Sequence, residues 1–158
     1  MELKRVVVTG IGAVSPLGNS AAETWQKLLD GVSGAAPITH FDATEFKTQF
    51  ACELKGFKAE DFIDRKEARK MDPYCHYALA AASMAMDDSA IDLESIDKNR
   101  VGVVFGVGIG GMKTFEDEIT NYALHKDTLG PKFNPFFVPK MIADICAGQI
   151  SIKYGFHG

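Results

Sequence analysis

The sequence predicts an α/β protein whose helices need more sheet than this chain itself supplies. Residues 4–10 and 100–106 are short runs of mainly apolar residues next to glycines, which is typical of buried strands. Helical segments lie between and after these strands, and that order favours an α/β architecture. Two or three strands are few for the long apolar helices that follow them. We therefore expect residues 1–158 to form part of a larger domain.

Composition narrows the classes of function. The 158 residues are 46% apolar and 24% charged, and a net charge of −4 favours neither nucleic acid nor a membrane surface as partner. Three widely spaced cysteines without a CxxC pair indicate reduced thiols in a cytoplasmic protein. No apolar run is long enough to span a bilayer, and the first residues lack the pattern of a signal peptide.

The first half of the chain has clear start and stop signals for helices. Ser20 and Glu23 have the spacing of a capping box, and Gly31 marks the end of the helix that they open. Residues 48–54 indicate a strand in an otherwise irregular stretch. Asp72 and Pro73 then predict the start of an alanine-rich helix that runs to about Met86. Because this helix is apolar on most sides, we expect it to be buried.

The second half is less sharply marked. Residues 112–126 predict a surface helix, and residues 131–139 predict a loop that is bounded by prolines. Residues 140–154 carry several isoleucines and predict another buried helix.

Two glycine-rich stretches raise the question of a nucleotide site. Gly106–Gly111 fits G-x-G-x-x-G after a predicted strand, and Lys4–Gly12 is predicted as a second strand that runs into glycines. The first stretch lacks a following strand that ends in an acidic residue. The second stretch has Val14 where the pattern T-G-x-x-x-G-x-G of short-chain dehydrogenases requires its next glycine. We therefore interpret the glycines at 106–111 as positions of close backbone approach or tight turning.

Taken in order, several motifs resemble the β-ketoacyl-acyl-carrier-protein synthase family, in its type II class. The resemblance extends along the whole chain. It is carried by Arg5–Gly12 with Ser15–Asn19, by His40-Phe41-Asp42, by Asp64–Glu67 with Arg69–Asp72, by Gly106 with Gly108–Gly111, and by Pro135–Pro139. Ile109 and the Phe-Phe-Val-Pro run favour the type II class over the type I class.

The resemblance implies the N-terminal portion of a thiolase-like fold over residues 1–158, and a cytoplasmic homodimer with acyltransferase activity. The family elongates fatty acids: an acyl group is loaded onto a cysteine, and malonyl-acyl-carrier protein loses CO₂ and attacks the thioester. No cofactor is implied, because the substrates carry phosphopantetheine. The family's nucleophile motif is absent here, and none of the three cysteines or four histidines matches a catalytic residue. We therefore expect this chain alone to be inactive.

The same resemblance assigns roles to five residues. Lys66, Arg69 and Lys70 match a docking site for the acidic acyl carrier protein, and Lys66 and Lys70 share a face if that stretch is helical. Ile109 matches the residue that gates the acyl pocket, and Phe137 matches an aromatic residue that lines the pocket of the dimer partner. Without the resemblance, the charged run is an ordinary solvated turn that Asp64 and Glu67 balance, and Ile109 and Phe137 are ordinary core residues.

Two other functions remain open at this point. The chain could be a docking and pocket-lining subunit that lends its surfaces to a separate catalytic polypeptide. It could also be a nucleotide-binding α/β domain, which would bind NAD or FAD saturably. The sequence does not determine the acyl chain length that the pocket would accept.

Overall fold

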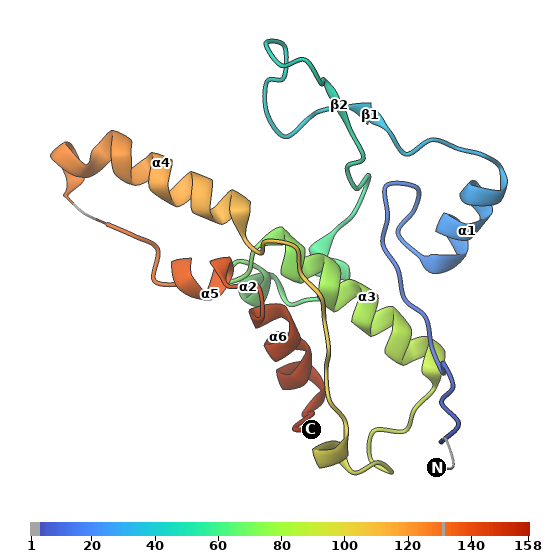
Figure 1. The fold of residues 1–158 in the computed structure, drawn as a ribbon. Coiled ribbons are helices and arrows are strands. Elements are labelled where there is room, and N and C mark those ends of the chain that lie inside the picture. The colour runs from blue at the N-terminus through green and yellow to red at the C-terminus, as the bar shows by residue number, and fades with distance from the viewer. Residues whose placement is uncertain (1–3, 131) are drawn as a thin grey trace. The chain divides into compact units, whose positions relative to one another are not determined.

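The computed structural model describes residues 4–130 and 132–158 (Figure 1). Within them the chain divides into two compact units. The first contains the residues up to Lys58 together with Ala80–Ile91, and the second contains Ala59–Leu79 and Asp92–Gly158. The elements follow the chain as α1 (Ala21–Leu29), β1 (Ala36–Pro37), β2 (Phe50–Ala51), η1 (Ala59–Asp61), α2 (Arg65–Ala68), α3 (Pro73–Ser89), η2 (Lys98–Arg100), α4 (Met112–Leu129), α5 (Phe137–Met141) and α6 (Ile145–Tyr154).

Helix α1 is built as its sequence predicts. The Ser20 hydroxyl accepts a hydrogen bond from the Glu23 N–H at 3.1 Å, and the Glu23 carboxylate accepts one from the Asn19 N–H at 2.9 Å. The capping box is thus closed through Asn19, one residue earlier than the usual arrangement. The helix ends in a Schellman motif, because Gly31 has φ +68° and the Val32 N–H bonds to the Lys27 carbonyl.

The predicted buried helix is confirmed as α3. Cys75, Ala78, Leu79 and Ala80 are all buried. Asp72 accepts a hydrogen bond from the Tyr74 N–H at 3.3 Å, which caps the first turn. The predicted surface helix at 112–126 is also confirmed, as the longer α4, in which no residue is buried.

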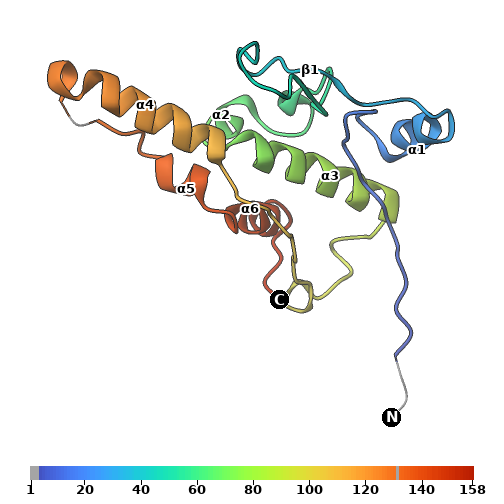
Figure 2. The same ribbon diagram turned by 45° about the horizontal axis from the view of Figure 1, so that its top comes forward.

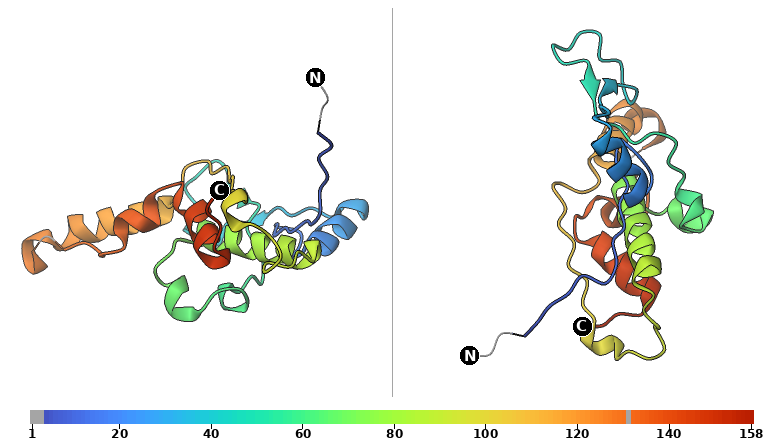
Figure 3. Two further views of the ribbon diagram at one scale, coloured as in Figure 1. Left: turned by 90° about the horizontal axis from the view of Figure 1, so that it is seen from below. Right: turned by 90° about the vertical axis from the view of Figure 1, so that its right-hand side faces the viewer.

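The strands differ most from expectation. Residues 4–10 and 101–106 run extended without belonging to any strand in the part of the chain described (Figures 2 and 3). Val6 is 89% exposed and Val104 is 99% exposed. A strand exists only where a neighbour completes its hydrogen-bond ladder. The described residues supply one ladder alone, the antiparallel pairing of β1 with β2, in which Ala36 faces Ala51.

The C-terminal helical region is divided where one helix was predicted. Helix α5 begins at Phe137, inside the predicted loop, and ends at Met141, while α6 begins at Ile145. Pro139 is compatible with α5 because it lies in the first turn, where its missing N–H is not needed. In α6, Cys146 and Ile150 are buried. No helix of the described chain combines the length and apolarity that crossing a membrane requires.

Candidate functional site

The predicted basic patch, Lys66, Arg69 and Lys70, lies on α2 and on the turn that follows it. The Asp64 carboxylate caps α2 by accepting hydrogen bonds from the N–H groups of Lys66 (2.8 Å) and Glu67 (3.4 Å). The helix ends at Ala68, whose carbonyl oxygen lies 2.8 Å from Nε2 of His76. Lys70 therefore lies beyond the helix, and the condition under which Lys66 and Lys70 share one helical face is not met.

The three cations of the basic patch differ in what they contact. The Lys70 ammonium lies 2.7 Å from a Glu67 carboxylate oxygen and 5.9 Å from the centre of the Phe136 ring. Lys66 and Arg69 are exposed, and neither forms an ion pair with another described residue. Glu67 thus balances the charge of Lys70, whereas the described residues place no carboxylate within ion-pair distance of Lys66 or Arg69.

Ile109 lies at an apolar cavity of about 360 Å³, which we call the apolar pocket. Its side chain is 70% exposed. The pocket is lined by Ile109, Gly111, Met112, Phe115, Met141, Ile142 and Ala143. Met112 and Phe115 come from the first turn of α4 at i,i+3 spacing, which places both on the same side of the helix. The Gly111 N–H donates to the Met141 carbonyl at 3.1 Å and holds the two sides together.

Phe137 belongs to a row of aromatic rings, the aromatic stack. Its ring centre lies 6.2 Å from that of Phe115 and 5.6 Å from that of Phe133, and Phe133 in turn lies 5.0 Å from Tyr122. All the interplanar angles are below 30°, at 27°, 19° and 18°. These rings connect α4 with α5, which lie side by side in Figures 1 and 2.

The structure therefore brings the two predicted pocket residues into one region. Phe115 lines the apolar pocket beside Ile109 and also stacks on Phe137. Sequence reasoning missed Phe115, as it missed Met112 and Met141. The i,i+3 spacing of Met112 and Phe115 directly after Gly111 is the signal that would have found two of them.

The cysteines of the helices lack the properties of a nucleophile. Cys75 and Cys146 are fully buried. Burial raises the pKa of the Cys75 thiol to about 11 and also raises the pKa of the Cys146 thiol. Because the thiolate is the reactive form, both thiols are unreactive at neutral pH. The described residues also contain no group of three His, Cys, Asp or Glu side chains placed to bind a metal ion.

The glycine loop before α4 is not arranged for phosphate. Both oxygens of the Asp72 carboxylate are used: one caps α3, and the other accepts hydrogen bonds from the Thr114 N–H (3.1 Å) and the Thr114 hydroxyl (2.6 Å). Asp72 therefore places a carboxylate at the start of α4, the position at which a nucleotide-binding loop holds phosphate. In the first unit the Ile11 N–H is likewise bound to the Asp88 carboxylate, at 2.8 Å.

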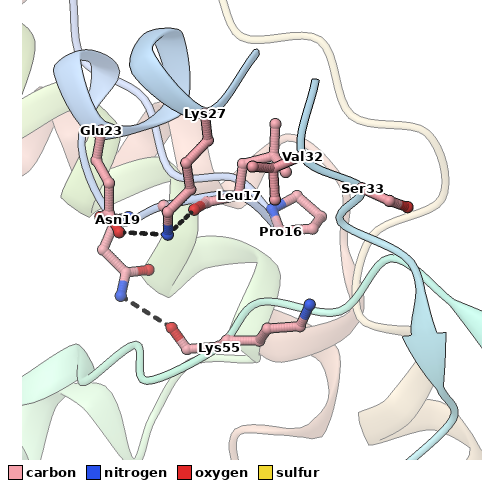
Figure 4. Close-up of a pocket in the computed structure, with 9 residues that line it drawn as sticks. Pro16, Leu17, Asn19, Glu23, Lys27, Val32, Ser33 and Lys55 are labelled. Carbon is pink, nitrogen blue, oxygen red and sulfur yellow. Dashed lines mark hydrogen bonds and ion pairs between the residues drawn. The ribbon is translucent and has the colours of Figure 1, made fainter. Parts of the chain in front are cut away.

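A small polar pocket of about 120 Å³ lies in the first unit (Figure 4). Its cations are bound within the chain: the Lys27 ammonium donates to the Leu17 carbonyl and to Glu23, and the Lys55 ammonium donates to the Gly34 carbonyl. Asn19 donates to the Lys55 carbonyl, but its own Oδ1 is buried without a donor from any described residue. Space of this size is sufficient for water, the usual partner of such an atom.

Comparison with known proteins places the chain among ketosynthases. The 3-oxoacyl-[acyl-carrier-protein] synthase 2 of Synechocystis sp. is 43% identical over all of this chain, which spans 37% of that relative's length. The solved ishigamide ketosynthase/chain length factor superposes with a TM-score of 0.87 at 26% identity, over 98% of this chain and 38% of that one. A ketosynthase in complex with the acyl-carrier protein of a type II polyketide synthase gives a TM-score of 0.77 at 28% identity, over 98% of this chain and 41% of that one.

These neighbours confirm the predicted fold, which is part of the thiolase-like fold of ketosynthases. The model of the β-ketoacyl synthase N-terminal domain matches residues 3–158, nearly the whole chain. The chain therefore belongs to the β-ketoacyl synthase family, in the region of that family's N-terminal domain.

Proposed function

We propose that the chain is the N-terminal part of a cytoplasmic, homodimeric synthase that elongates fatty acids. In the proposed reaction an acyl group is held as a thioester on a cysteine. Loss of CO₂ from malonyl-carrier protein leaves a carbanion, which forms the new carbon–carbon bond, and the cysteine thiolate leaves. The nucleophile and the catalytic histidines come from residues other than those of this chain, which spans 37% of the Synechocystis relative.

The observation that carries the proposal is the apolar pocket. It is an open cavity of about 360 Å³ that is lined by apolar side chains and backbone, Ile109 and Phe115 among them. Burial of each methylene of an acyl chain there contributes about 0.8 kcal/mol. Phe137 supports the wall of this pocket by stacking on Phe115. The role of this chain is thus to hold the acyl chain while the thioester reacts elsewhere.

The exposed cations Lys66 and Arg69 support docking of an acidic carrier protein. Opposite charges across an interface speed the encounter and fix its orientation, and salt screens them. The solved complex of a related ketosynthase with an acyl-carrier protein adds support.

A chimera tests the proposed activity. Residues 1–158 replace the matching part of the Synechocystis relative, and condensation of acyl-carrier protein with malonyl-carrier protein is measured by mass spectrometry. We expect the chimera to condense and the 158-residue chain alone not to. In the chimera, Ile109→Trp should fill the pocket and exclude long acyl chains first. A folded chimera that loads no acyl group would contradict the proposal.

Docking is tested separately with charge reversal. Lys66→Glu and Arg69→Glu should each weaken binding of the carrier protein at low salt, and the loss should shrink as salt rises. Lys47→Glu is the matched control, because Lys47 is also exposed but lies outside the basic patch. If the 158-residue chain instead binds tightly to a separate polypeptide that carries the remaining residues, the docking-subunit alternative is correct.

A further inference from the structure

Lys70 has contacts that the other two cations of the basic patch lack. Its ammonium is shared between the Glu67 carboxylate at 2.7 Å and the face of the Phe136 ring at 5.9 Å. The second distance lies within the range of a cation–π contact. Lys66 and Arg69 have no such contacts among the described residues. Lys70 therefore connects the end of α2 with the residue just before α5.

Phe136 is the N-cap residue of α5, directly before Phe137. Its N–H donates to the Asn134 side chain at 2.9 Å, and its carbonyl accepts from the Lys140 N–H at 2.9 Å. Asn134 is in turn fixed to α4, because its N–H donates to the Glu118 carboxylate at 3.0 Å. The backbone at Phe136 is thus held on the α4 side by Asn134, while the ring is held on the α2 side by Lys70 alone among the described cations.

Phe137, the residue after Phe136, supports the apolar pocket through its ring. Phe137 stacks between Phe133 and Phe115, and Phe115 lines the pocket beside Ile109. A change in the position of Phe136 alters the start of α5 and therefore the placing of Phe137. The contact of Lys70 with Phe136 is thus a physical connection between the basic patch and the wall of the pocket.

We propose that Lys70 is a positioning residue that sets the acyl-chain selectivity of the pocket through Phe136 and Phe137. The part of this proposal that concerns acyl chains rests on the proposed function. Glu67 keeps the ammonium near the ring, since it offers the only carboxylate that the described structure places within ion-pair distance of Lys70.

The test compares Lys70→Met with Lys66→Met in the chimera, with Phe136→Leu and Lys70→Arg alongside. Lys66→Met should weaken binding of the carrier protein about two- to fivefold, as loss of one exposed pair does, and leave the acyl-length profile unchanged. Lys70→Met and Phe136→Leu should shift the profile in the same direction, and the double variant should shift it no further. Lys70→Arg should restore the parent profile, because arginine also pairs with carboxylates and stacks on rings.

A second measurement does not depend on activity. Hydrogen exchange of the backbone amides at residues 137, 138 and 140–142 in the chimera should rise in Lys70→Met and stay at the parent level in Lys66→Met. If Lys70→Met matches Lys66→Met in both the acyl profile and the exchange, the proposal is wrong. If the unsubstituted chimera is inactive, the proposed function fails, and the exchange rates alone decide whether Lys70 positions α5.

Discussion

The two glycine-rich loops look alike in sequence, yet their glycines have different surroundings. In the first unit, a Cβ on Gly10 or Gly12 would collide with the backbone of α3, at Ala85 and Ala81 respectively. In the second loop, at residues 106–111, only the last two glycines are tightly packed, Gly110 against Met141 and Gly111 against Lys140. A Cβ at Gly106 or Gly108 would meet no atom of the described residues within 4 Å. A glycine pattern therefore does not distinguish a position of close packing from an open one.

The loops also differ in the carboxylate that each of them binds. Asp88, which accepts from the Ile11 N–H, is exposed to solvent. Asp72, which accepts from Thr114, is only 4% exposed and connects the starts of two helices. A buried group that loses its partners costs more than an exposed one, because water cannot replace them. We therefore expect substitutions in the second loop to span the wider range of effects.

Gly110→Ala should have the largest effect. Gly110 has φ +96°, which L-residues rarely adopt, and an added Cβ would overlap the Met141 carbonyl oxygen. The backbone penalty of about 1–2 kcal/mol and an overpacking cost of about 1–3 kcal/mol together predict that the free energy of unfolding falls by about 2–5 kcal/mol. Urea unfolding followed by circular dichroism measures the change. A loss below about 1 kcal/mol would mean that the loop relaxes away from α5.

Asp72→Ala should have the second largest effect and lower the free energy of unfolding by about 2–3 kcal/mol. It removes a helix cap and leaves the Thr114 N–H without its acceptor. Thr114→Val keeps the shape of the partner and removes only its hydroxyl. In a double-mutant cycle the two substitutions should be clearly non-additive. Additive losses would show that the contact between Asp72 and Thr114 contributes nothing of its own.

Asp88→Ala tests the equivalent contact of the first loop and should cost only about 0.5–1 kcal/mol. The Ile11 N–H is exposed and can bind water once the carboxylate is gone. Asp87→Ala is a matched control, since Asp87 is the exposed neighbour on the same helix. A loss as large as that of Asp72→Ala would remove the distinction between the two loops.

Gly106→Ala should change the free energy of unfolding least, by less than about 0.5 kcal/mol, because no atom of the described residues lies within 4 Å of the added methyl group. Alanine also restricts the unfolded state, which offsets part of any loss of stability. The measurement is again the midpoint of urea unfolding, compared with that of Gly110→Ala. A strong loss at Gly106 would mean that the open space beside it is filled in solution.

The helices could be predicted because their signals are local. Ser20 and Gly31 delimit α1, and Asp72 with Pro73 starts α3, each through contacts within a few residues. The strands could not be predicted from such runs, since pairing depends on a partner elsewhere in the chain. The apolar runs around Val6 and Val104 therefore predicted buried strands, whereas the structure leaves both exposed. The start of α5 was missed because Pro135 and Pro139 indicate a loop.

The site was predictable only in part. Ile109 and Phe137 were singled out by family resemblance, and the structure brings them to one region through Phe115, which the sequence analysis did not single out. The basic patch was predicted as a set of equivalent charges. Its members differ because, of the three cations, Lys70 is the one that contacts Glu67 and Phe136. The contact with Phe136 joins residues that lie far apart in the chain. Such contacts depend on tertiary structure and cannot be read from local spacing.

Asp72 has one further consequence. At the start of α4 the protein supplies its own anion, on the same polypeptide as the groups that bind it. The effective concentration of that anion is set by the geometry of the chain, and dissolved ions compete with it poorly. The junction of α3 and α4 should therefore keep its form whether phosphate in the surroundings is scarce or abundant. A loop that binds a diffusing phosphate would instead report the level of that metabolite.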